Sequence, residues 1–471
     1  SRLLGDVIDT KSRVDIDSVP KLQALADAVS AVMDAAKGVR GVTAAQINLL
    51  GLTNVTNDNL PAVFRALGAT TDNGTGVDTL TELQTVINTA VTNANNAVAI
   101  LIDFAEENNA SLSPITAGNV GATPILSTYQ NAGVIGVTAS NLDAINDALA
   151  TQLINGASVN TTAKMQVVAD AYQAVIQLAD GFGNSPSHID VTAVQYTQIG
   201  VSGLDLNSAL TSHKISLLND VIDRKIYTNI DTVYEIQALL SDVSALLNTA
   251  AGGNALTLAQ LSALGFDNVS ANTLADVIAA IQLTAADGSD VDTFAELSTV
   301  ISNRLISIQN ALNVIAQYAQ NNSSTTQLQP SGVAPTENDY AAAGVHGVTA
   351  GNLALINDAL ATYTVNEASV NTTLEVQALV DAYTLVIRAA NGLETQGVVK
   401  PTALQYSLLG LTGIDPVANT SAARASLLGD VIDRKSLADI DTVNELQALL
   451  DAVINVGNAA KGIAGLTQSQ L

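Results

Sequence analysis

The chain has 471 residues, of which 48% are hydrophobic, 3% are aromatic and none is cysteine, and its 44 acidic against 18 basic residues give a formal net charge of −26. The absence of cysteine excludes disulfides, thiolate metal sites and cysteine catalysis. The acidic surface argues against nucleic-acid binding, because phosphates are held by clustered Lys and Arg. No apolar run reaches the ~20 residues that span a bilayer, so we expect no membrane insertion.

One phrase recurs along the chain at a long period. Residues 3–9 read Leu-Leu-Gly-Asp-Val-Ile-Asp, and close copies follow at 217–223 and 427–433. The steps of 214 and 210 residues define a long repeat of about 212 residues, which is the signature of an array of modules. Residues 1–47 and 425–471 share 28 of 47 positions. We therefore expect a window cut from a longer array, or one register of a continuous polymer.

A shorter unit is nested within the long one. It is marked by an aliphatic residue, then Asp or Asn, then Thr or Ser, with the middle residue at Asp17, Asp78, Asn160, Asp231, Asp292, Asn371 and Asp441. Three unequal modules therefore make one long repeat. The predicted boundaries are the end of a preceding module at 1–14, module 1 at 15–76, the long module 2 at 77–157, module 3 at 158–228, second copies of the three at 229–289, 290–368 and 369–438, and the start of a further module 1 at 439–471.

The first predicted helix of each module begins at a cap. In a capping box the Thr hydroxyl accepts from the third amide of the helix, and the Glu at that third position reaches back to the Thr amide. This pattern occurs at Thr79/Glu82, Thr232/Glu235, Thr293/Glu296, Thr372/Glu375 and Thr442/Glu445, while Ser18 and Thr161 keep the cap without the Glu. Apolar residues then recur at helical spacing. In the long modules we expect this helix over about residues 79–107 and 293–320.

A short and a medium helix complete each predicted module. The short helix reads Thr, then an apolar residue or Tyr, then Gly at steps of four, as at Thr192, Tyr196 and Gly200. Glycine ends such a helix because it adopts the left-handed conformation without strain. The medium helix opens after Asn or Thr, as at Asn141 and Asn352. We therefore predict an all-α fold, built as a solenoid-like rod of three-helix modules with three modules in each long repeat.

Two equivalent loops are rich in carboxylates. One holds Asp72 and Asp78, and the other holds Asp287, Asp290 and Asp292. Carboxylates in a glycine-containing loop are suitable calcium ligands, although neither loop follows the EF-hand spacing. The simpler interpretation is a turn that leads into a helix, where Asp favours the positive end of the helix dipole. These five residues are the candidate metal site, and no other cofactor is expected.

The recurring phrase also carries a pair of carboxylates three residues apart, on one face if the segment is helical. The pairs are Asp6/Asp9, Asp220/Asp223 and Asp430/Asp433. Such pairs can perform acid–base chemistry or bind a cation. A solvated face with local ion pairs is the simpler interpretation, and an interface between modules or subunits is a further use of the same face.

The remaining chemically notable side chains give no sign of catalysis. His188, His213 and His346 fall at non-equivalent positions of the repeat, so we interpret them as incidental. Tyr129, Tyr196, Tyr340 and Tyr406 share one core-facing position of the short helix, where packing explains them better than ligand stacking. The chain has no phosphate loop, nucleophile elbow or zinc signature, so we expect that it is not an enzyme.

Two phrases resemble a known type of repeat. The first runs from Thr43-Ala44-Ala45-Gln46 through Leu50-Gly51-Leu52-Thr53-Asn54-Val55-Thr56 to Leu60, and the second is Gly76-Val77-Asp78-Thr79-Leu80-Thr81-Glu82-Leu83-Gln84. They resemble the helical repeats of very large, adhesin-like cell-surface proteins of Gram-negative bacteria, and every module carries some version of them. The resemblance implies an extracellular, cell-surface location and supplies no catalytic residues.

These observations predict a structural role. We expect the repeat region of an extracellular bacterial surface fibre, acting as a stalk or as a self-assembling filament whose partners are neighbouring modules or subunits. Open-ended stacking through a heterologous interface would produce the filament. The alternative is an adhesive binding module, in which the loops Asn108–Pro124 and Asn321–Pro335 contact a surface glycan or another cell.

Overall fold

The computed structural model describes residues 2–39, 41–70, 74–109, 122–183, 189–323, 330–390 and 399–463. Helices take up 63% of the chain and no strand occurs in these ranges, which confirms the predicted all-α class. The β-type pairing seen there is an isolated bridge between Asp180 and Ile226. The chain forms two compact units, Ser1–Phe266 with Thr284–Leu297, and Asp267–Leu283 with Ser298–Leu471.

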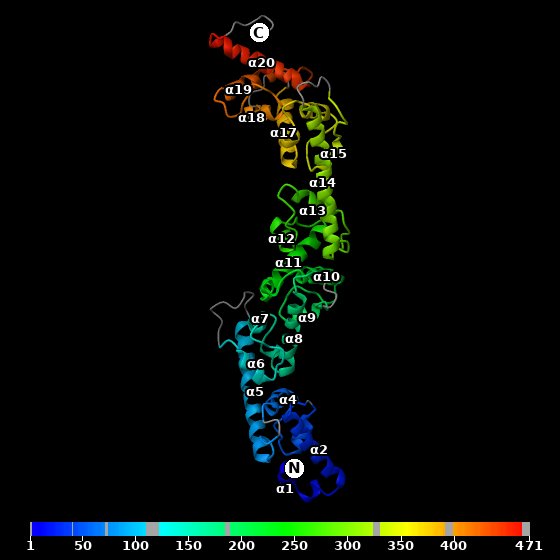
Figure 1. Ribbon diagram of the computed structural model, residues 1–471, viewed down its shortest axis with the longest axis vertical. Coiled ribbons are helices and arrows are strands. Elements are labelled where there is room, and N and C mark those ends of the chain that lie inside the picture. Colours follow the sequence, from blue (N-terminus) through cyan, green and yellow to red (C-terminus); the bar gives the residue numbers. More distant parts are fainter. Residues whose placement is uncertain are drawn as a thin grey trace. The chain divides into compact units, whose positions relative to one another are not determined.

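The first unit contains helices α1 to α12 and the first turn of α14 (Figure 1). Its α-helices are α1 (Arg2–Asp9), α2 (Val19–Ala36), α3 (Ala44–Leu49), α4 (Leu60–Gly68), α5 (Leu80–Asn108), α6 (Leu126–Ala132), α7 (Leu142–Leu149), α8 (Thr162–Leu178), α9 (Ala193–Gln198), α10 (Ala209–Asp223), α11 (Val233–Ala250) and α12 (Leu258–Ala263). Short 3₁₀ helices η1 (Arg13–Asp15), η2 (Gly156–Ser158) and η3 (Tyr227–Asn229) precede α2, α8 and α11.

The second unit contains α13, the rest of α14 and the helices that follow (Figure 1). Its α-helices are α13 (Leu274–Gln282), α14 (Phe294–Asn322), α15 (Glu337–Ala342), α16 (Leu353–Leu360), α17 (Thr373–Ala389), α18 (Ala403–Leu408), α19 (Ser421–Ile432) and α20 (Val443–Ala460). The 3₁₀ helices η4 (Glu367–Ser369) and η5 (Leu437–Asp439) precede α17 and α20.

The predicted capping boxes begin the long helices. At α5 the Glu82 amide donates to Thr79 Oγ1 at 3.2 Å, and the Thr79 amide donates to Glu82 Oε2 at 3.1 Å. The same reciprocal bonds occur at Thr232/Glu235, Thr293/Glu296, Thr372/Glu375 and Thr442/Glu445. Helices α5 and α14 therefore begin one residue after their caps, close to the predicted starts.

The prediction for Ser18 is wrong, whereas that for Thr161 is confirmed. The Ser18 side chain makes no capping hydrogen bond, while Thr161 accepts from the Lys164 amide at 3.2 Å. Near Ser18, the Lys21 ammonium donates to Asp17 and to the Val14 carbonyl. Lys164 makes the same two bonds beside the intact Thr161 cap, so the proline in the first turn of α2 is the difference that accompanies the loss of the cap.

Glycine ends the short helices as predicted. Gly51, Gly200, Gly265, Gly344 and Gly410 all have positive φ, between 74° and 100°. At Gly200 and Gly410 an added Cβ would also collide with the side chains of Thr151 and Thr362. The tight reversal and the close approach of another segment both require glycine at these two positions.

The core is built from small aliphatic side chains and buried tyrosines. In the first unit one continuous apolar cluster links α1 to α5, from Leu3 to Val91. In the second unit another cluster links α14 to α20, from Ile308 to Val453. Tyr129, Tyr196, Tyr340 and Tyr406 are essentially fully buried, which confirms their predicted core-facing position.

Candidate functional site

In the predicted calcium loop of the second repeat, each of the three carboxylates binds a different partner. Asp287 Oδ1 accepts from the amide and hydroxyl of Ser289 at 3.1 and 2.8 Å, and these bonds lower the pKa of Asp287. Asp290 Oδ2 accepts from the Ala285 amide at 2.9 Å. Asp292 instead contacts Nδ1 of His213 on α10. Asp287 and Asp290 therefore have partners within the turn that leads into α14, whereas Asp292 has its partner on another helix.

The equivalent loop of the first repeat is described only in part. Asp72 lies outside the described residues, and Asp78 lies 3.9 Å from the Arg2 guanidinium. Across the ranges that the structure describes, no three His, Asp or Glu side chains are grouped to hold a metal ion. Calcium binding at Asp72, Asp78, Asp287, Asp290 and Asp292 stays a prediction.

The carboxylate pairs of the recurring phrase contact other segments of the chain. Asp6 Oδ2 accepts from the Leu80 amide at 3.2 Å, and Asp220 Oδ2 accepts from the Phe294 amide at 2.8 Å. Both amides belong to the first residue of a 29-residue helix, where no intrahelical acceptor exists. The carboxylates also favour the positive end of the helix dipole. In the first and second copies, the face that carries these aspartates therefore contacts another segment of the chain, which is one of the uses that the sequence left open.

The other members of the pairs do not form one solvated face. Asp9 is exposed, but Asp223 and Asp433 are buried. In the third copy Asp430 forms an ion pair with Lys400. The prediction of a solvated face therefore fails at the second residue of the later two pairs.

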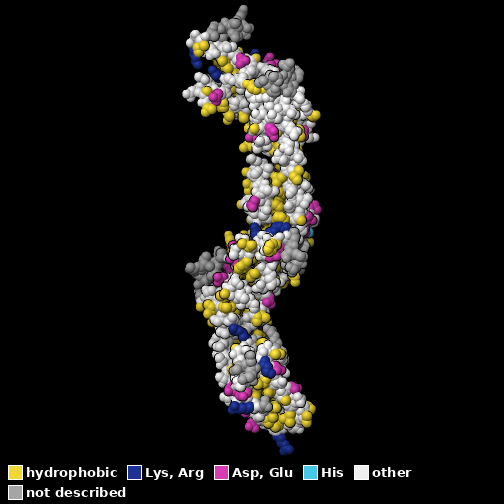
Figure 2. All heavy atoms as spheres, viewed as in Figure 1, with side chains coloured by type: hydrophobic (Ala, Val, Ile, Leu, Met, Phe, Trp, Pro, Cys, Tyr) yellow, Lys and Arg dark blue, Asp and Glu magenta, His cyan; other side chains and the backbone are white. Residues whose placement is uncertain are grey.

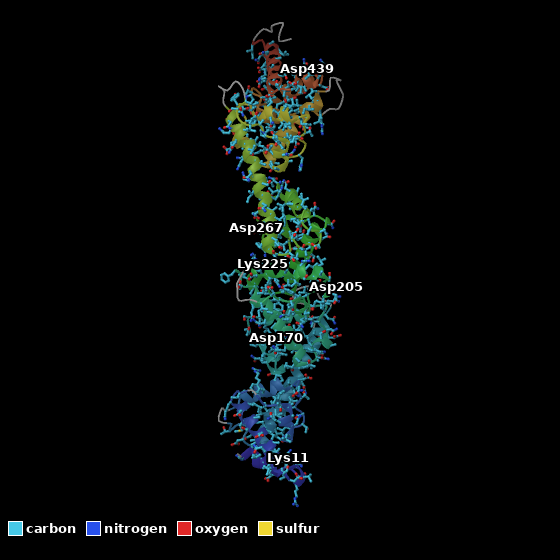
Figure 3. The ribbon with its side chains drawn as sticks, turned by 90° about the vertical axis from the view of Figure 1, so that its right-hand side faces the viewer. Lys11, Asp170, Asp205, Lys225, Asp267 and Asp439 are labelled. Carbon is cyan, nitrogen blue, oxygen red and sulfur yellow. The ribbon has the colours of Figure 1, made fainter. Side chains whose placement is uncertain are left out.

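Lysines of the same segment bind helix C-termini. Lys11 Nζ donates to the Leu49 carbonyl at 2.6 Å, and Lys225 Nζ donates to the Ala263 carbonyl at 2.8 Å; both lysines are labelled in Figure 3. The acceptors are the last residues of α3 and α12, whose carbonyls have no intrahelical partner. A cation also favours the negative end of the helix dipole. The recurring phrase thus contacts the N-terminus of one later helix and the C-terminus of another.

A second pair of carboxylates was missed in the sequence. Asp147 on α7 accepts from the Val233 amide of α11, and Asp358 on α16 accepts from the Val443 amide of α20, both at 2.6 Å. Burial raises the pKa of Asp358, and the nearby Asp441 adds to this effect. The repeated phrase Ile-Asn-Asp-Ala-Leu at 145–149 and 356–360 was the available signal.

Three of the buried tyrosines bind an asparagine. The hydroxyls of Tyr129, Tyr340 and Tyr196 donate to Asn146, Asn357 and Asn219 at 2.6, 2.7 and 2.7 Å. Each asparagine amide in turn donates to a backbone carbonyl, of Pro124, Pro335 or Val191. This arrangement fixes the short helix to the medium helix and to the loop before the short helix. It is a structural network and leaves no reactive group exposed.

The fourth tyrosine lacks this partner. Gly429 stands where Asn219 stands in the earlier copy. The buried Tyr406 hydroxyl has no hydrogen-bond partner among the described residues. The two long repeats are therefore alike in helices but not in their buried polar contacts.

The first and second repeats also differ at one ion pair. Asp276 on α13 binds Arg304 on α14, and both side chains are largely buried. The equivalent positions of the first repeat are Ala62 and Ala90. These alanines line a small cavity of about 270 Å³ beside Arg65. The first repeat thus has a gap where the second has a buried pair of charges.

A larger cavity of about 520 Å³ lies against α4 in the first unit. Leu60, Pro61 and Phe64 of α4 form much of its wall, and Asp58 and Arg65 contribute charged groups. Its volume is in the range of small-molecule pockets. Polar side chains at its rim include Thr162 and Gln166.

The other predicted sites fall partly outside the described residues. His188 and residues 110–121 and 324–329 of the two long loops are among those not described. His346 bonds through its backbone to the side chain of Gln377, so its imidazole takes no part in that contact. Adhesion through the loops stays a prediction.

No described helix is both long and apolar enough to cross a membrane. Comparison with known proteins found no protein-family model, no curated protein and no solved structure that matches this chain.

Proposed function

We propose that this chain is the structural repeat region of an extracellular bacterial surface fibre, acting as a stalk or as a self-assembling filament. In this proposal three-helix modules stack as a solenoid-like rod, with three modules in each long repeat. Neighbouring modules or subunits are the partners, and no catalysis is involved.

One observation carries the proposal, which is that long-range contacts recur with the long repeat. The bonds Asp6–Leu80 and Asp220–Phe294 both span 74 residues. The bonds Asp147–Val233 and Asp358–Val443 span 86 and 85 residues. With the predicted module boundaries, each bond passes over one whole module and joins the two on either side. A stack held this way resists bending at its joints, which suits a stalk.

The chemistry of the chain supports the same role. The repeated side chains are caps, buried tyrosine networks and helix-end contacts, all of which stabilise the stack. The charge of −26 favours solubility. The extracellular location rests on the resemblance to giant surface proteins.

Deletion of residues 217–426 tests the proposal, since it removes one long repeat and joins two copies of the same phrase. The shortened protein should keep its helical circular dichroism and its cooperative unfolding. In electron micrographs, with calcium and with a chelator, it should form rods of the original width and reduced length. A deletion of 217–391, which breaks the repeat, is the control and should unfold or aggregate. Globular particles from the unmodified chain would contradict a stalk.

A further inference from the structure

Arg65 of α4 borders two cavities of the first unit. The larger one, of about 520 Å³, has Leu60, Pro61 and Phe64 of the same helix in its wall. The smaller one, of about 270 Å³, extends from α4 to α5 and α6, both of which α4 contacts (Figure 1). The Arg65 side chain lines both cavities, so it lies between an apolar space and a more polar one.

The wall of the larger cavity opposite α4 is held in place by hydrogen bonds. Gln166 of α8 accepts from the Ile135 amide at 2.8 Å and donates to the Ile135 carbonyl at 3.0 Å. Gly133 lies so close to α4 that an added Cβ would be 2.7 Å from the Ala62 nitrogen. The walls are therefore fixed without a ligand, which lowers the entropic cost of binding one.

The guanidinium of Arg65 is available to a ligand. Arg65 is exposed, and no residue in the described ranges forms an ion pair or a hydrogen bond with its side chain. The smaller cavity is also lined by the side-chain amides of Asn93, Gln130 and Asn131. Each amide adds hydrogen-bond donors beside the cation. Donors around a guanidinium suit a carboxylate.

The chain as a whole repels anions. Its formal net charge is −26, and on the face shown in Figure 2 the Lys and Arg side chains form small, separate groups. An anion that binds this chain therefore needs a local cation, and its apolar part needs a surface that fits it. The two cavities beside Arg65 provide both.

The frame of this site recurs in the second copy, but its charge does not. Gln377 binds the backbone of His346 with the same two hydrogen bonds. On α13, Ala279 stands at the place of Arg65. Ala279 is exposed like Arg65, although the modules that precede α13 are part of the sequence. The open face is thus a feature of the repeat, and the arginine is peculiar to the first copy.

We propose that the two cavities beside Arg65 bind a small carboxylic acid with an apolar body. The carboxylate pairs with the guanidinium, whose parallel N–H groups match its two oxygens, and accepts from the amides of the smaller cavity. The apolar body covers Leu60, Pro61 and Phe64 in the larger cavity, where burial of its surface stabilises the complex. This ligand site goes beyond the structural role and does not depend on it.

Calorimetric titration of the full chain with octanoate tests the site. Octanoate should bind saturably, with one molecule per chain, and added salt should weaken the binding. Octanol lacks the charge and octylammonium reverses it, so each should bind about tenfold more weakly or worse. Equal binding of octanol or octylammonium would overturn the proposal, since Arg65 would then not select the ligand; for octylammonium, Asp58 in the same lining would explain the result. Absence of saturable octanoate binding would overturn it as well.

Variants of Arg65 separate recognition from folding. Because Arg65 is exposed, Arg65→Ala should keep the circular dichroism spectrum, weaken octanoate binding about tenfold and leave octanol binding unchanged. Arg13→Ala is the matched control, since it removes an exposed arginine of the same unit that lines neither cavity, and it should bind octanoate normally. An equal loss in Arg13→Ala would mean that octanoate responds to net charge alone, which would refute the site. Octanoate should also slow amide hydrogen exchange in α4 and at the start of α8, and protection confined to other helices would refute this placement.

Discussion

Tyr196 and Tyr406 provide a matched pair for measuring one buried hydrogen bond. Both rings are fully buried at equivalent positions. The Tyr196 hydroxyl donates to Asn219 Oδ1 at 2.7 Å, whereas Gly429 replaces that asparagine beside Tyr406. Replacing each tyrosine with phenylalanine removes the same atom from two different surroundings. The two changes should therefore have different effects on the free energy of unfolding.

The magnitudes follow from what each change leaves behind. Tyr196→Phe leaves the buried Asn219 Oδ1 without its donor, which costs about 1–3 kcal/mol. Tyr406→Phe removes a hydroxyl that has no partner among the described residues, so the change should be neutral or stabilising by about 1 kcal/mol. Gly429→Asn should stabilise the chain by about 1 kcal/mol through the new bond. The Lys400 side chain, which pairs with Asp430, has to shift, since its Cδ, Cβ and Cγ would lie 2.9, 3.0 and 3.1 Å from the added Cβ.

The assay is urea unfolding followed by circular dichroism, together with amide hydrogen exchange in α9 and α18. Exchange is needed because a long array can unfold in parts, so that one global transition does not report every site. Gly429→Asn in the Tyr406→Phe background is the control, and its stabilising effect should be smaller by about 1 kcal/mol. If Tyr196→Phe and Tyr406→Phe lower the free energy of unfolding equally, the hydrogen bond to Asn219 adds no measurable stability, and both effects come from packing.

Three further predictions concern caps and charges. Burial raises the pKa of Asp358 in the folded chain. The stability gained from protonating this carboxyl is therefore fully present below the ordinary carboxyl pKa of about 3.9 and is lost as the pH rises through the raised pKa. Asp358→Asn should remove this part of the pH dependence of the free energy of unfolding, measured by urea unfolding. Thr232→Ala should lower the free energy of unfolding by about 1 kcal/mol through loss of the α11 cap, while Thr232→Ser should not. Arg304→Ala should lower the free energy of unfolding by about 2 kcal/mol, because it leaves the largely buried Asp276 carboxylate without its partner. Replacing both Arg304 and Asp276 with alanine should lower it by less in the same assay.

The local structure of this chain could be predicted because its signals are local. The Thr79–Glu82 cap lies within one turn of helix, and so do the other four capping boxes. The left-handed glycines likewise follow from a single helix end. Ser18 makes no such bond, and its turn contains Pro20, whereas Lys21 forms the same bonds as Lys164 beside the intact Thr161 cap. A local rule is thus overridden where the residues around the cap differ.

The contacts between segments could not be predicted from spacing. Asp147 recurs as Asp358 in the second copy, but the sequence does not say which amide it meets, and that amide belongs to a helix 86 residues later. The acidic loop at Asp287 and Asp290 was the more obvious candidate, but its carboxylates bind nearby amides. The role of each carboxylate therefore depends on which unpaired helix amide the fold brings to it.

Two equivalent aspartates have different partners among the described residues. Asp220 accepts from the Phe294 amide at 2.8 Å and is partly buried, whereas the equivalent Asp430 is exposed and pairs with Lys400. Asp220→Ala should therefore cost about 1–2 kcal/mol, as expected for a lost N-terminal cap. Asp430→Ala should cost about 0–1 kcal/mol, as for a surface ion pair, and added salt should remove that effect. Urea unfolding of the two variants measures the difference. Equal costs would mean that the contact over 74 residues adds no more stability than a surface ion pair, which would refute this reasoning.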